Sequence, residues 1–339
     1  MPIALPSKIT NLLCSKAYYS LFIVLLIASE IPLCMFIVEK IKYTEIDWVA
    51  YMQEVEHFLN GTLDYDQIQG QTGPCVYPAG FLYLYTFLYH ATDKGQNIKL
   101  GQYIFTFLYI LTLLLVFNLY RIGRQTPPYA FVFMCVISYR IHSIFILRLF
   151  NDPLAMLAVY ACVNMLLYSR FSLACILFSI GVSVKMNVLL FLPGLVLTLL
   201  YHRGFLQTCG HMFECILVQL LVGLPFLFHN PAAYVGRAFD FGRQFLYRWT
   251  VNWRVIPESV FSDRRFHISL LVLHLLFLSI VLIRFVRLDV THAVIYPMFV
   301  ANLVGVMFSR SLHYQFYVWY FHTLAYLFWC VPRFPGVLK

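Results

Sequence analysis

Apolar runs of about 20 residues recur along almost the whole sequence, and this is the length that a helix needs to cross the core of a bilayer. Of the 339 residues, 61% are apolar and only 12% are charged, whereas soluble domains are about half apolar and a quarter charged. Because lipid offers the backbone no hydrogen bonds, such runs must cross the membrane as helices. The sequence therefore predicts an all-α, polytopic helical membrane protein.

The hydropathy pattern predicts about ten membrane spans. The first is too long for a signal peptide and has no small-residue cleavage site, so we expect a retained anchor. Two long polar segments, 40–98 and 229–267, interrupt the series, and no internal repeat is visible, so we expect one integral membrane domain over residues 1–339. The spans are predicted near residues 17–39, 99–120, 128–147, 153–169, 172–185, 188–201, 212–228, 268–286, 292–308 and 315–331.

The segment 77–92 is apolar but short and rich in tyrosine, a residue that favours the membrane–water interface. We interpret it as an interfacial or re-entrant helix, and a true span is the alternative. If it does not cross, short basic turns lie in the cytosol with both chain termini, and nearly every acidic residue lies on the opposite side. Residues 40–98 and 229–267 then form two large loops on that acidic side.

The formal net charge of +9 does not indicate nucleic-acid binding, because the basic residues stand at span ends rather than in one patch. Anionic lipid headgroups or a phosphate-bearing substrate are the expected partners. The nine cysteines are scattered and show no disulfide framework or metal-ligand spacing. A glycosylation sequon at Asn60 suits a loop outside the cytosol.

Three polar stretches, 44–48, 147–153 and 309–321, are predicted to converge on one face of the membrane together with the arginine-rich loop 229–267. Carboxylates beside arginines at a membrane interface suggest a site for a charged headgroup. The arginines of these stretches that we select as binding residues are Arg148, Arg243 and Arg254.

Two carboxylates of these stretches have both a structural and a catalytic interpretation. Asp47 follows the first span closely, so it is held near the bilayer, but it also suits the N-cap of the amphipathic helix that follows. Asp152 precedes Pro153, a pattern typical of a helix start. The remaining acidic residues of the first loop are interpreted as a solvated face: Glu54, Glu56, Asp64 and Asp66.

Lys185 stands between two apolar runs. A charge at a span centre costs about 2.5–3.5 kcal/mol, so Lys185 marks either the end of a span or a functional site. Arg140 and His142 raise the same question, although both can snorkel to the interface. A functional role is also expected for the residues that begin the last span, namely Arg310, His313 and Tyr314.

Six ordered segments between about residues 40 and 330 carry a specific resemblance. They resemble the dolichyl-phosphate-mannose-dependent alpha-1,3-mannosyltransferase family of N-glycan assembly, which belongs to the GT-C superfamily of polytopic endoplasmic-reticulum glycosyltransferases. The segments are "TEIDWVAYMQEVEHFLNGTLDY", "GQTGPCVYPAGFLYLY", "YRIHSIFILRLFNDP", "SVKMNVLLFLPG", "FGRQFLYRWTVNWR" and "SRSLHYQFYVWYFHTL".

The resemblance implies a GT-C type architecture, an endoplasmic-reticulum location and an active site on the lumenal face. It implies dolichyl phosphate mannose as the donor and the five-mannose dolichyl-diphosphate oligosaccharide as the acceptor. Enzymes of this superfamily invert the transferred sugar and carry an essential acidic residue in the first lumenal loop. By resemblance we assign that role to Asp47, with Glu45 in reserve and Asp152 as a further catalytic candidate.

The chemistry of such a transfer agrees with these residue types. A sugar hydroxyl needs a carboxylate to take its proton as it attacks. The leaving group is already a phosphate, so it needs cationic stabilisation rather than a general acid. Lys185, Arg310, His313 and the arginines of 237–254 are the candidates, and nothing in the sequence demands a metal or another cofactor.

Three other functions compete with this interpretation. A different GT-C transferase would use the same donor chemistry with another acceptor. A transporter or flippase of lipid-linked sugars would also bind lipid phosphates, but inverted repeats and paired broken helices would be expected, and neither is visible. A structural membrane subunit without chemistry would not need carboxylates and arginines gathered on one face.

Overall fold

A computed structural model describes residues 13–243, 246–285 and 292–330, so the predicted cytosolic termini lie outside the described residues. The prediction of an all-α fold is confirmed, because the only strands in these ranges are the two-residue strands Gln69–Gly70 and Gly73–Pro74 of one short hairpin. The elements are η1 (Lys16–Tyr18), α2 (Tyr19–Lys40), α3 (Trp48–Leu59), β1 (Gln69–Gly70), β2 (Gly73–Pro74), α4 (Ala79–Ala91), α5 (Ile98–Gly123), α6 (Tyr129–Val136), α7 (Tyr139–His142), the π-helix η2 (Ser143–Leu147), α8 (Asp152–Leu167), α9 (Phe171–Val184), η3 (Met186–Phe191), α10 (Leu192–His229), α11 (Pro231–Ala238), η4 (Tyr247–Trp249), α12 (Glu258–Phe261), α13 (Arg264–Phe285), α14 (His292–Met307), η5 (Tyr314–Phe316) and α15 (Tyr317–Cys330).

Four helical segments within the described ranges are long and apolar enough to cross a membrane. They are Lys16–Lys40, Ile98–Gly123, Met186–His229 and Arg264–Val281. The pair Tyr129–Val136 and Tyr139–Leu147, bent by 50°, would make a fifth. The chain is therefore a membrane protein, but the predicted count of about ten spans is not confirmed.

The predicted spans 153–169 and 172–185 correspond to the helices α8 and α9, which have 16 and 14 residues. At about 1.5 Å per residue these helices are about 24 and 21 Å long, which is shorter than the bilayer core of about 30 Å. Most of α8 is buried by protein. Its apolar sequence therefore reflects packing on nearly all sides, as in a core helix.

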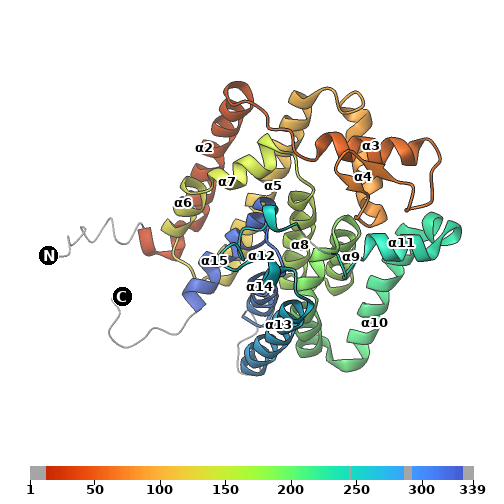
Figure 1. Ribbon diagram of the computed structural model, residues 1–339. Coiled ribbons are helices and arrows are strands. Elements are labelled where there is room, and N and C mark those ends of the chain that lie inside the picture. The colour runs from red at the N-terminus through yellow and green to blue at the C-terminus, as the bar shows by residue number, and fades with distance from the viewer. Residues whose placement is uncertain (1–12, 244–245, 286–291, 331–339) are drawn as a thin grey trace.

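The predicted span 188–201 covers the end of η3 and the first part of α10, and 212–228 lies within α10, which is interrupted at Gly204. Gly204 has a φ of 74° and a ψ of 176°, a conformation that glycine adopts without the strain of a Cβ atom. Figure 1 shows the chain turning back between the two halves of α10. This element is thus two helices joined at a glycine break.

The segment 77–92 forms α4, a helix of only 13 residues. At about 20 Å it is shorter than a bilayer core of about 30 Å, and it is not among the candidate spans. It packs on α3 and α9, and several of its large side chains are buried, including Phe81, Leu82 and Tyr85. The interpretation of 77–92 as a helix that does not span agrees with this length.

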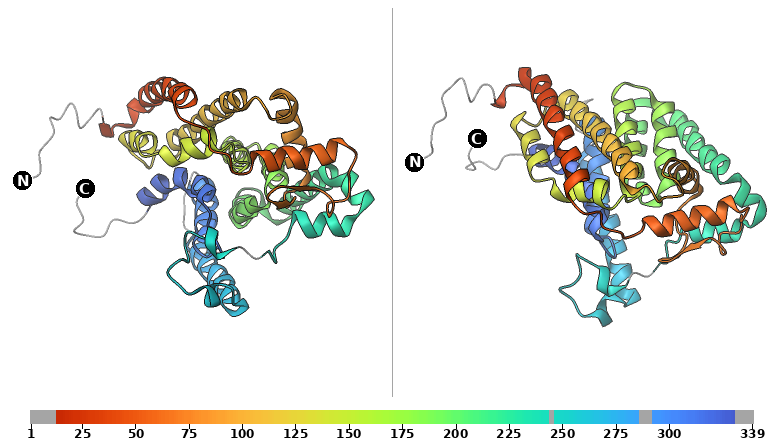
Figure 2. Two further views of the ribbon diagram at one scale, coloured as in Figure 1. Left: turned by 45° about the horizontal axis from the view of Figure 1, so that its top comes forward. Right: turned by 90° about the horizontal axis from the view of Figure 1, so that it is seen from above.

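The long helices form a row in which each packs on the next: α2 on α5, α5 on α8, α8 on α9, and α9 on α10. Figure 2 shows these helices side by side, with α3 and α11 at one end of the row. Helix α10 also packs on α14, and α14 packs on α13 and α15. The row of helices from α2 to α10 is therefore joined to α13, α14 and α15 through the contact between α10 and α14.

Close backbone contacts and buried amides hold these helices together, as is usual where lipid provides no hydrophobic driving force. A Cβ atom on Gly194 of α10 would lie 2.4 Å from the carbonyl oxygen of Pro297 in α14, so only glycine permits this approach. Asn302 of α14 donates to the carbonyl oxygen of Trp319 in α15 at 2.7 Å. Gln102 of α5 donates to the carbonyl oxygen of Ile146 at 2.9 Å.

Candidate active site

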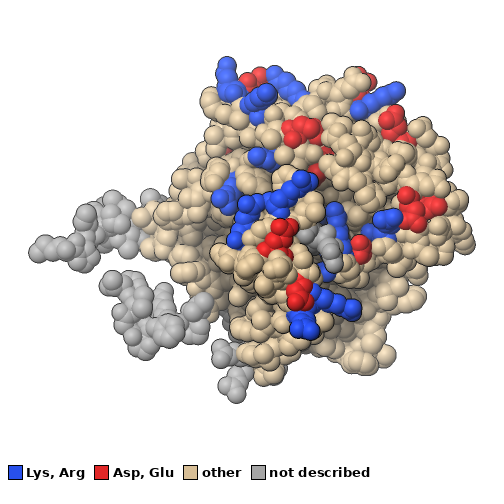
Figure 3. Space-filling model, viewed as in Figure 1, with Lys and Arg blue, Asp and Glu red and all other residues tan. Residues whose placement is uncertain are grey.

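A cavity of about 1970 Å³ is lined by residues of the loops between these helices, such as Glu45, Arg148 and Leu312. Seven lysines and arginines line it against three carboxylates, so its charge favours an anionic ligand. Figure 3 shows Lys and Arg side chains gathered in the middle of one face, where Figure 1 places α12 and the loops beside it. Nine of the ten predicted site residues line the cavity: Glu45, Asp47, Arg148, Lys185, Arg243, Arg254, Arg310, His313 and Tyr314.

Backbone hydrogen bonds join the polar stretches that line the cavity. The Thr44 N–H donates to the carbonyl oxygen of Leu147 at 2.9 Å, and the Val251 N–H donates to that of Leu312 at 2.8 Å. Asn252 reinforces the second contact, because its amide donates to the carbonyl oxygen of Ser309 at 3.1 Å and its Oδ1 accepts from the Leu312 N–H at 2.9 Å. The stretches predicted to converge are thus joined directly.

Asp47 occupies the N-cap position of α3, but its side chain caps nothing. Glu45 supplies the cap instead, since its Oε1 accepts from the Val49 N–H at 3.0 Å and its Oε2 accepts from the Tyr43 hydroxyl at 2.6 Å. The Asp47 carboxylate faces the cavity and accepts a long hydrogen bond of 3.4 Å from Tyr51. The capping interpretation of the Asp47 side chain is therefore wrong.

Burial raises the pKa of Asp47, and the positive charge of Lys185 opposes this shift. Nearby Asp152 and Glu45 add to the increase in pKa. A general base works best when its pKa is close to the working pH. The surroundings of Asp47 therefore move this carboxylate in the direction that base catalysis requires.

Asp152 is the one predicted site residue that does not line the cavity. It is completely buried and lies behind Lys185, whose Nζ donates to Asp152 Oδ2 at 2.7 Å and to Asn151 Oδ1 at 2.9 Å. Trp319 donates to the other Asp152 oxygen at 2.6 Å. The Asp152 carboxylate therefore neither caps α8 nor reaches the cavity, so both its capping and its catalytic interpretation are corrected.

Lys185 lies at the break between α9 and η3, with an extended backbone. It is 7% exposed, yet it lines the cavity and lies 5.5 Å from the centre of the Tyr77 ring. An ammonium group has three N–H donors, and two of those of Lys185 form hydrogen bonds, to Asn151 and Asp152. Lys185 is thus both a helix end and a cation held at the cavity wall.

The cavity arginines differ in how their guanidinium groups are used. Arg148 stacks over the Tyr314 ring at 4.6 Å and donates to the Ser143 hydroxyl. Arg310 donates to the carbonyl oxygen of Phe241. Arg254 donates to two carbonyl oxygens of its own loop, so it helps to fold the loop 247–256 as well as line the cavity.

His313 was expected to supply positive charge to the site. Burial, together with the charges of Lys185 and Arg243, lowers its pKa to about 4. His313 is therefore neutral at pH 7. It can form a hydrogen bond with a ligand, but it adds no positive charge, so that part of the expectation is corrected.

The structure contradicts the interpretation of Glu54 as part of a solvated loop face. Its side chain is 3% exposed and lines the cavity. Glu54 follows Asp47 by seven residues and Tyr51 by three, so all three share one face of α3. That spacing was the one signal in the sequence that would have identified Glu54.

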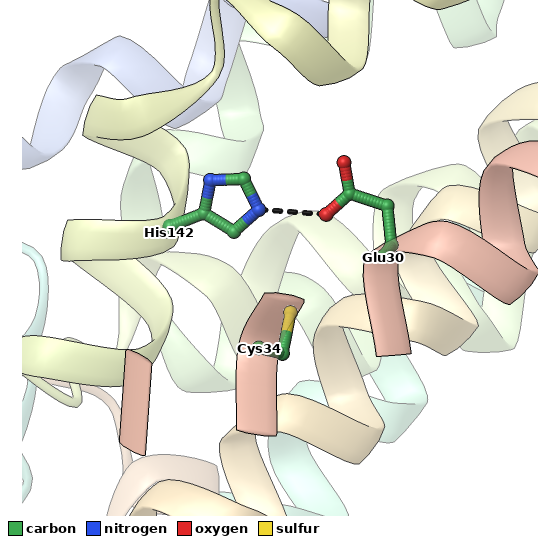
Figure 4. Close-up of side chains that lie close together, drawn as sticks. All are labelled: Glu30, Cys34 and His142. Carbon is green, nitrogen blue, oxygen red and sulfur yellow. Dashed lines mark hydrogen bonds and ion pairs between the residues drawn. The ribbon is translucent and has the colours of Figure 1, made fainter. Parts of the chain in front are cut away.

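A second polar cluster joins α2, α5 and α7 away from the cavity. Figure 4 shows Glu30 and His142 pointing toward one another beside Cys34, and His142 Nε2 lies 2.7 Å from Glu30 Oε2. Tyr109 of α5 also donates to Glu30, at 3.2 Å. His142 is buried, so the snorkelling interpretation is wrong for this residue.

The ligand atoms of Glu30, Cys34 and His142 lie within 4.8 Å of one another, close enough to share a metal ion. A second group of this kind is formed by Cys175, His211 and Glu214. None of these six residues lines the cavity. Both groups are therefore separate from the candidate active site.

Comparisons with known proteins agree on one family. The model of the ALG3 protein family matches residues 24–339. A Mus musculus protein named Dol-P-Man:Man(5)GlcNAc(2)-PP-Dol alpha-1,3-mannosyltransferase is 49% identical, over 90% of this chain and 74% of its own length. The Homo sapiens protein of the same name is 48% identical, over 95% of this chain and 78% of its own length. The Arabidopsis thaliana protein of that name is 41% identical, over 93% of this chain and 78% of its own length.

Proposed function

The chain belongs to the ALG3 protein family, and from that premise we propose how its cavity transfers a sugar. It is a mannosyltransferase, which moves mannose from dolichyl phosphate mannose to Man5GlcNAc2 on dolichyl diphosphate in alpha-1,3 linkage. The observation that carries the proposal is the pairing of the Asp47 carboxylate with a cation-lined cavity. This combination supplies a base for the acceptor and counter-charges for the leaving phosphate.

The transfer is proposed to be a single displacement with inversion. An acceptor mannose hydroxyl attacks C1 of the donor mannose, and its oxygen forms the new bond as the bond from C1 to the phosphate oxygen breaks. The hydroxyl proton goes to Asp47, and the electron pair of the broken bond leaves with dolichyl phosphate. Asp47 is therefore the general base of the reaction.

Negative charge grows on the phosphate as it leaves, so preorganised donors at that position lower the barrier. Lys185 is proposed to direct its remaining N–H toward the phosphate, since Asp152 and Asn151 hold its other two. Asp152 thus acts as a positioning residue. Arg148, Arg243, Arg310 and Tyr314 complete the proposed phosphate site, and we propose that no metal or cofactor takes part.

The placement in the membrane is also a proposal. We expect the chain to lie in the endoplasmic-reticulum membrane with GT-C type architecture and its cavity open to the lumen. The short helices α8, α9, α14 and α15, the two halves of α10 and the bent α6–α7 pair would join α2, α5 and α13 to give about ten crossings. The loops 40–98 and 229–267, which contribute to the cavity, would both be lumenal.

The direct test uses the purified full chain with dolichyl phosphate mannose and the five-mannose lipid-linked acceptor. Linkage analysis should find one added mannose in alpha-1,3 linkage. Transfer only to a different acceptor would indicate another GT-C transferase. Absence of transfer, together with movement of the lipid-linked sugar across a vesicle bilayer, would indicate a flippase instead.

Removal of Arg310 tests the phosphate site. Arg310→Ala should raise the donor KM or lower kcat/KM by the equivalent of about 1.5–3 kcal/mol, the usual value for a hydrogen bond to a charged group. The control is Arg203→Ala, which removes an exposed arginine that does not line the cavity. If Arg310→Ala and Arg203→Ala show the same KM and kcat/KM for the donor, Arg310 serves only to hold the loop around Phe241 in its fold.

A further inference from the structure

Glu54 is a buried carboxyl group to which the proposed reaction gives no role. Its side chain is 3% exposed, and its Oε2 has no hydrogen-bond partner among the described residues. Native proteins rarely leave such an atom unsatisfied. Because Glu54 lines the cavity, a ligand there is the natural partner for this oxygen.

The wall around Glu54 offers further polar groups. Gln71 and Thr72, at the tip of the β1–β2 hairpin, line the same cavity. The hairpin is held on α3, because Gln53 accepts from the Gln71 N–H at 2.6 Å. Carboxyl, amide and hydroxyl groups donate and accept hydrogen bonds in the combinations that sugar hydroxyls require.

The distance along α3 identifies which sugar reaches this wall. Glu54 lies seven residues beyond Asp47, which is about 10 Å along a helix axis. The donor carries one mannose, and its C1 must react beside Asp47. The acceptor named for the relatives carries Man5GlcNAc2, so it alone has sugar units that extend this far from the reacting hydroxyl.

We infer that Glu54, with Gln71 and Thr72, forms a subsite for a sugar of the acceptor that does not react, and that Glu54 donates a hydrogen bond to one of its hydroxyls. This inference rests on the proposed function. It makes Glu54 a residue that determines acceptor specificity rather than a catalytic residue. Binding energy from such a remote unit can also be used to orient the reacting hydroxyl.

The protonation of Glu54 supports this role. Its pKa is raised to about 8, mainly by burial and further by the charge of Asp47, against the opposing charge of Arg243. Glu54 is therefore neutral at pH 7, and only the neutral form has an O–H to donate. The titratable and charged groups that interact with it are Asp47 at the start of α3, Tyr65 before β1, Cys75 and Tyr77 after β2, and Arg243 after α11.

The test compares Glu54→Gln, which retains a donor at every pH, with Glu54→Leu, which has none. Glu54→Leu should raise the KM for the five-mannose acceptor about 10-fold or more at neutral pH, with an unchanged KM for dolichyl phosphate mannose. Glu54→Gln should stay close to wild type. Glu56→Gln is the matched control, because Glu56 lies exposed on the same helix.

The pH profile separates this role from a structural one. In wild type the acceptor KM should rise as the pH passes about 8, where Glu54 ionises, and in Glu54→Gln that rise should be absent. An unchanged acceptor KM in Glu54→Leu, or the same alkaline rise in Glu54→Gln, would overturn the inference. If a thermal melt shows that Glu54→Leu does not fold, the pH dependence of the acceptor KM in Glu54→Gln still tests the inference.

Failure of the inference is distinguishable from failure of the proposed function. Wild-type protein that does not transfer mannose to the five-mannose acceptor would refute the function itself. Wild-type transfer with identical acceptor kinetics in all three variants would refute only the role of Glu54. An acceptor with fewer mannose units adds a second readout, because it should lose its sensitivity to Glu54→Leu if it cannot reach the subsite.

Discussion

Asp47→Asn should lower mannosyl transfer by about 100-fold or more, while the folded protein remains as stable as wild type. Asn is as good an N-cap residue as Asp, and the Asp47 side chain makes no capping bond that the change would remove. The carbonyl oxygen of Asn can still accept the Tyr51 hydroxyl bond. What Asn cannot do is take a proton from the acceptor hydroxyl at neutral pH.

The pH dependence gives the same experiment a second readout. Because burial raises the pKa of Asp47, wild-type transfer should fall as the pH is lowered through that pKa and the base becomes protonated. The residual activity of Asp47→Asn should lack this acidic limb. Initial rates across the acidic range, measured at saturating donor, provide the comparison.

Asp66→Asn is the matched control for Asp47→Asn. Asp66 is a carboxylate of the same loop, but it is exposed in a surface ion pair with Arg237 and does not line the cavity. Its transfer rate should stay near that of wild type. Full activity in Asp47→Asn would show that this carboxylate takes no proton, and Glu45 would then be the next residue to replace.

Hydropathy predicts where the helices lie, but it does not by itself establish which of them cross the membrane. The predicted span 99–120 lies close to α5 (Ile98–Gly123), because a long apolar run has few structural alternatives. The same reasoning predicts a span at 172–185, where α9 has 14 residues, a length that crosses a bilayer only where the bilayer is locally thinned. Burial by protein and burial by lipid select the same apolar residues, so composition alone does not separate them.

The site shows a similar division between what stands out in a sequence and what does not. Lys185 stands out in the sequence because a cation between apolar runs is energetically costly. Glu54 does not stand out by its type, because a carboxylate in a polar loop is ordinary; the sequence offers only its helical spacing from Asp47, and the fold shows that its side chain is 3% exposed. The bond between Lys185 and Asp152 joins residues 33 positions apart, and no local pattern predicts such a partner.

Replacement of Lys185 should affect both folding and transfer. Lys185→Met would leave the completely buried Asp152 with Trp319 as its remaining donor among the described residues. Removal of one partner of a buried ion pair typically destabilises a protein by about 3–5 kcal/mol, a large part of a typical stability of about 5–15 kcal/mol. Thermal unfolding in detergent should therefore shift to clearly lower temperature, and transfer should fall with it.

A double variant separates the structural role of Lys185 from its proposed role at the phosphate. Lys185→Met with Asp152→Asn removes both charges and keeps an oxygen that can accept from Trp319. Because no unpaired charge then remains buried, stability should return most of the way to wild type. Transfer should stay low, since the ammonium group that faces the cavity is still missing.

Lys99→Met is the control for the loss of a lysine from an ion pair. Lys99 lies 2.7 Å from Glu39, the same separation as in the buried pair, but its side chain is 57% exposed. Exposed pairs contribute little because water screens them, so this variant should unfold and transfer mannose like wild type. If transfer recovers together with stability in the double variant, the charge of Lys185 serves the fold alone, and the arginines of the cavity must stabilise the leaving phosphate without it.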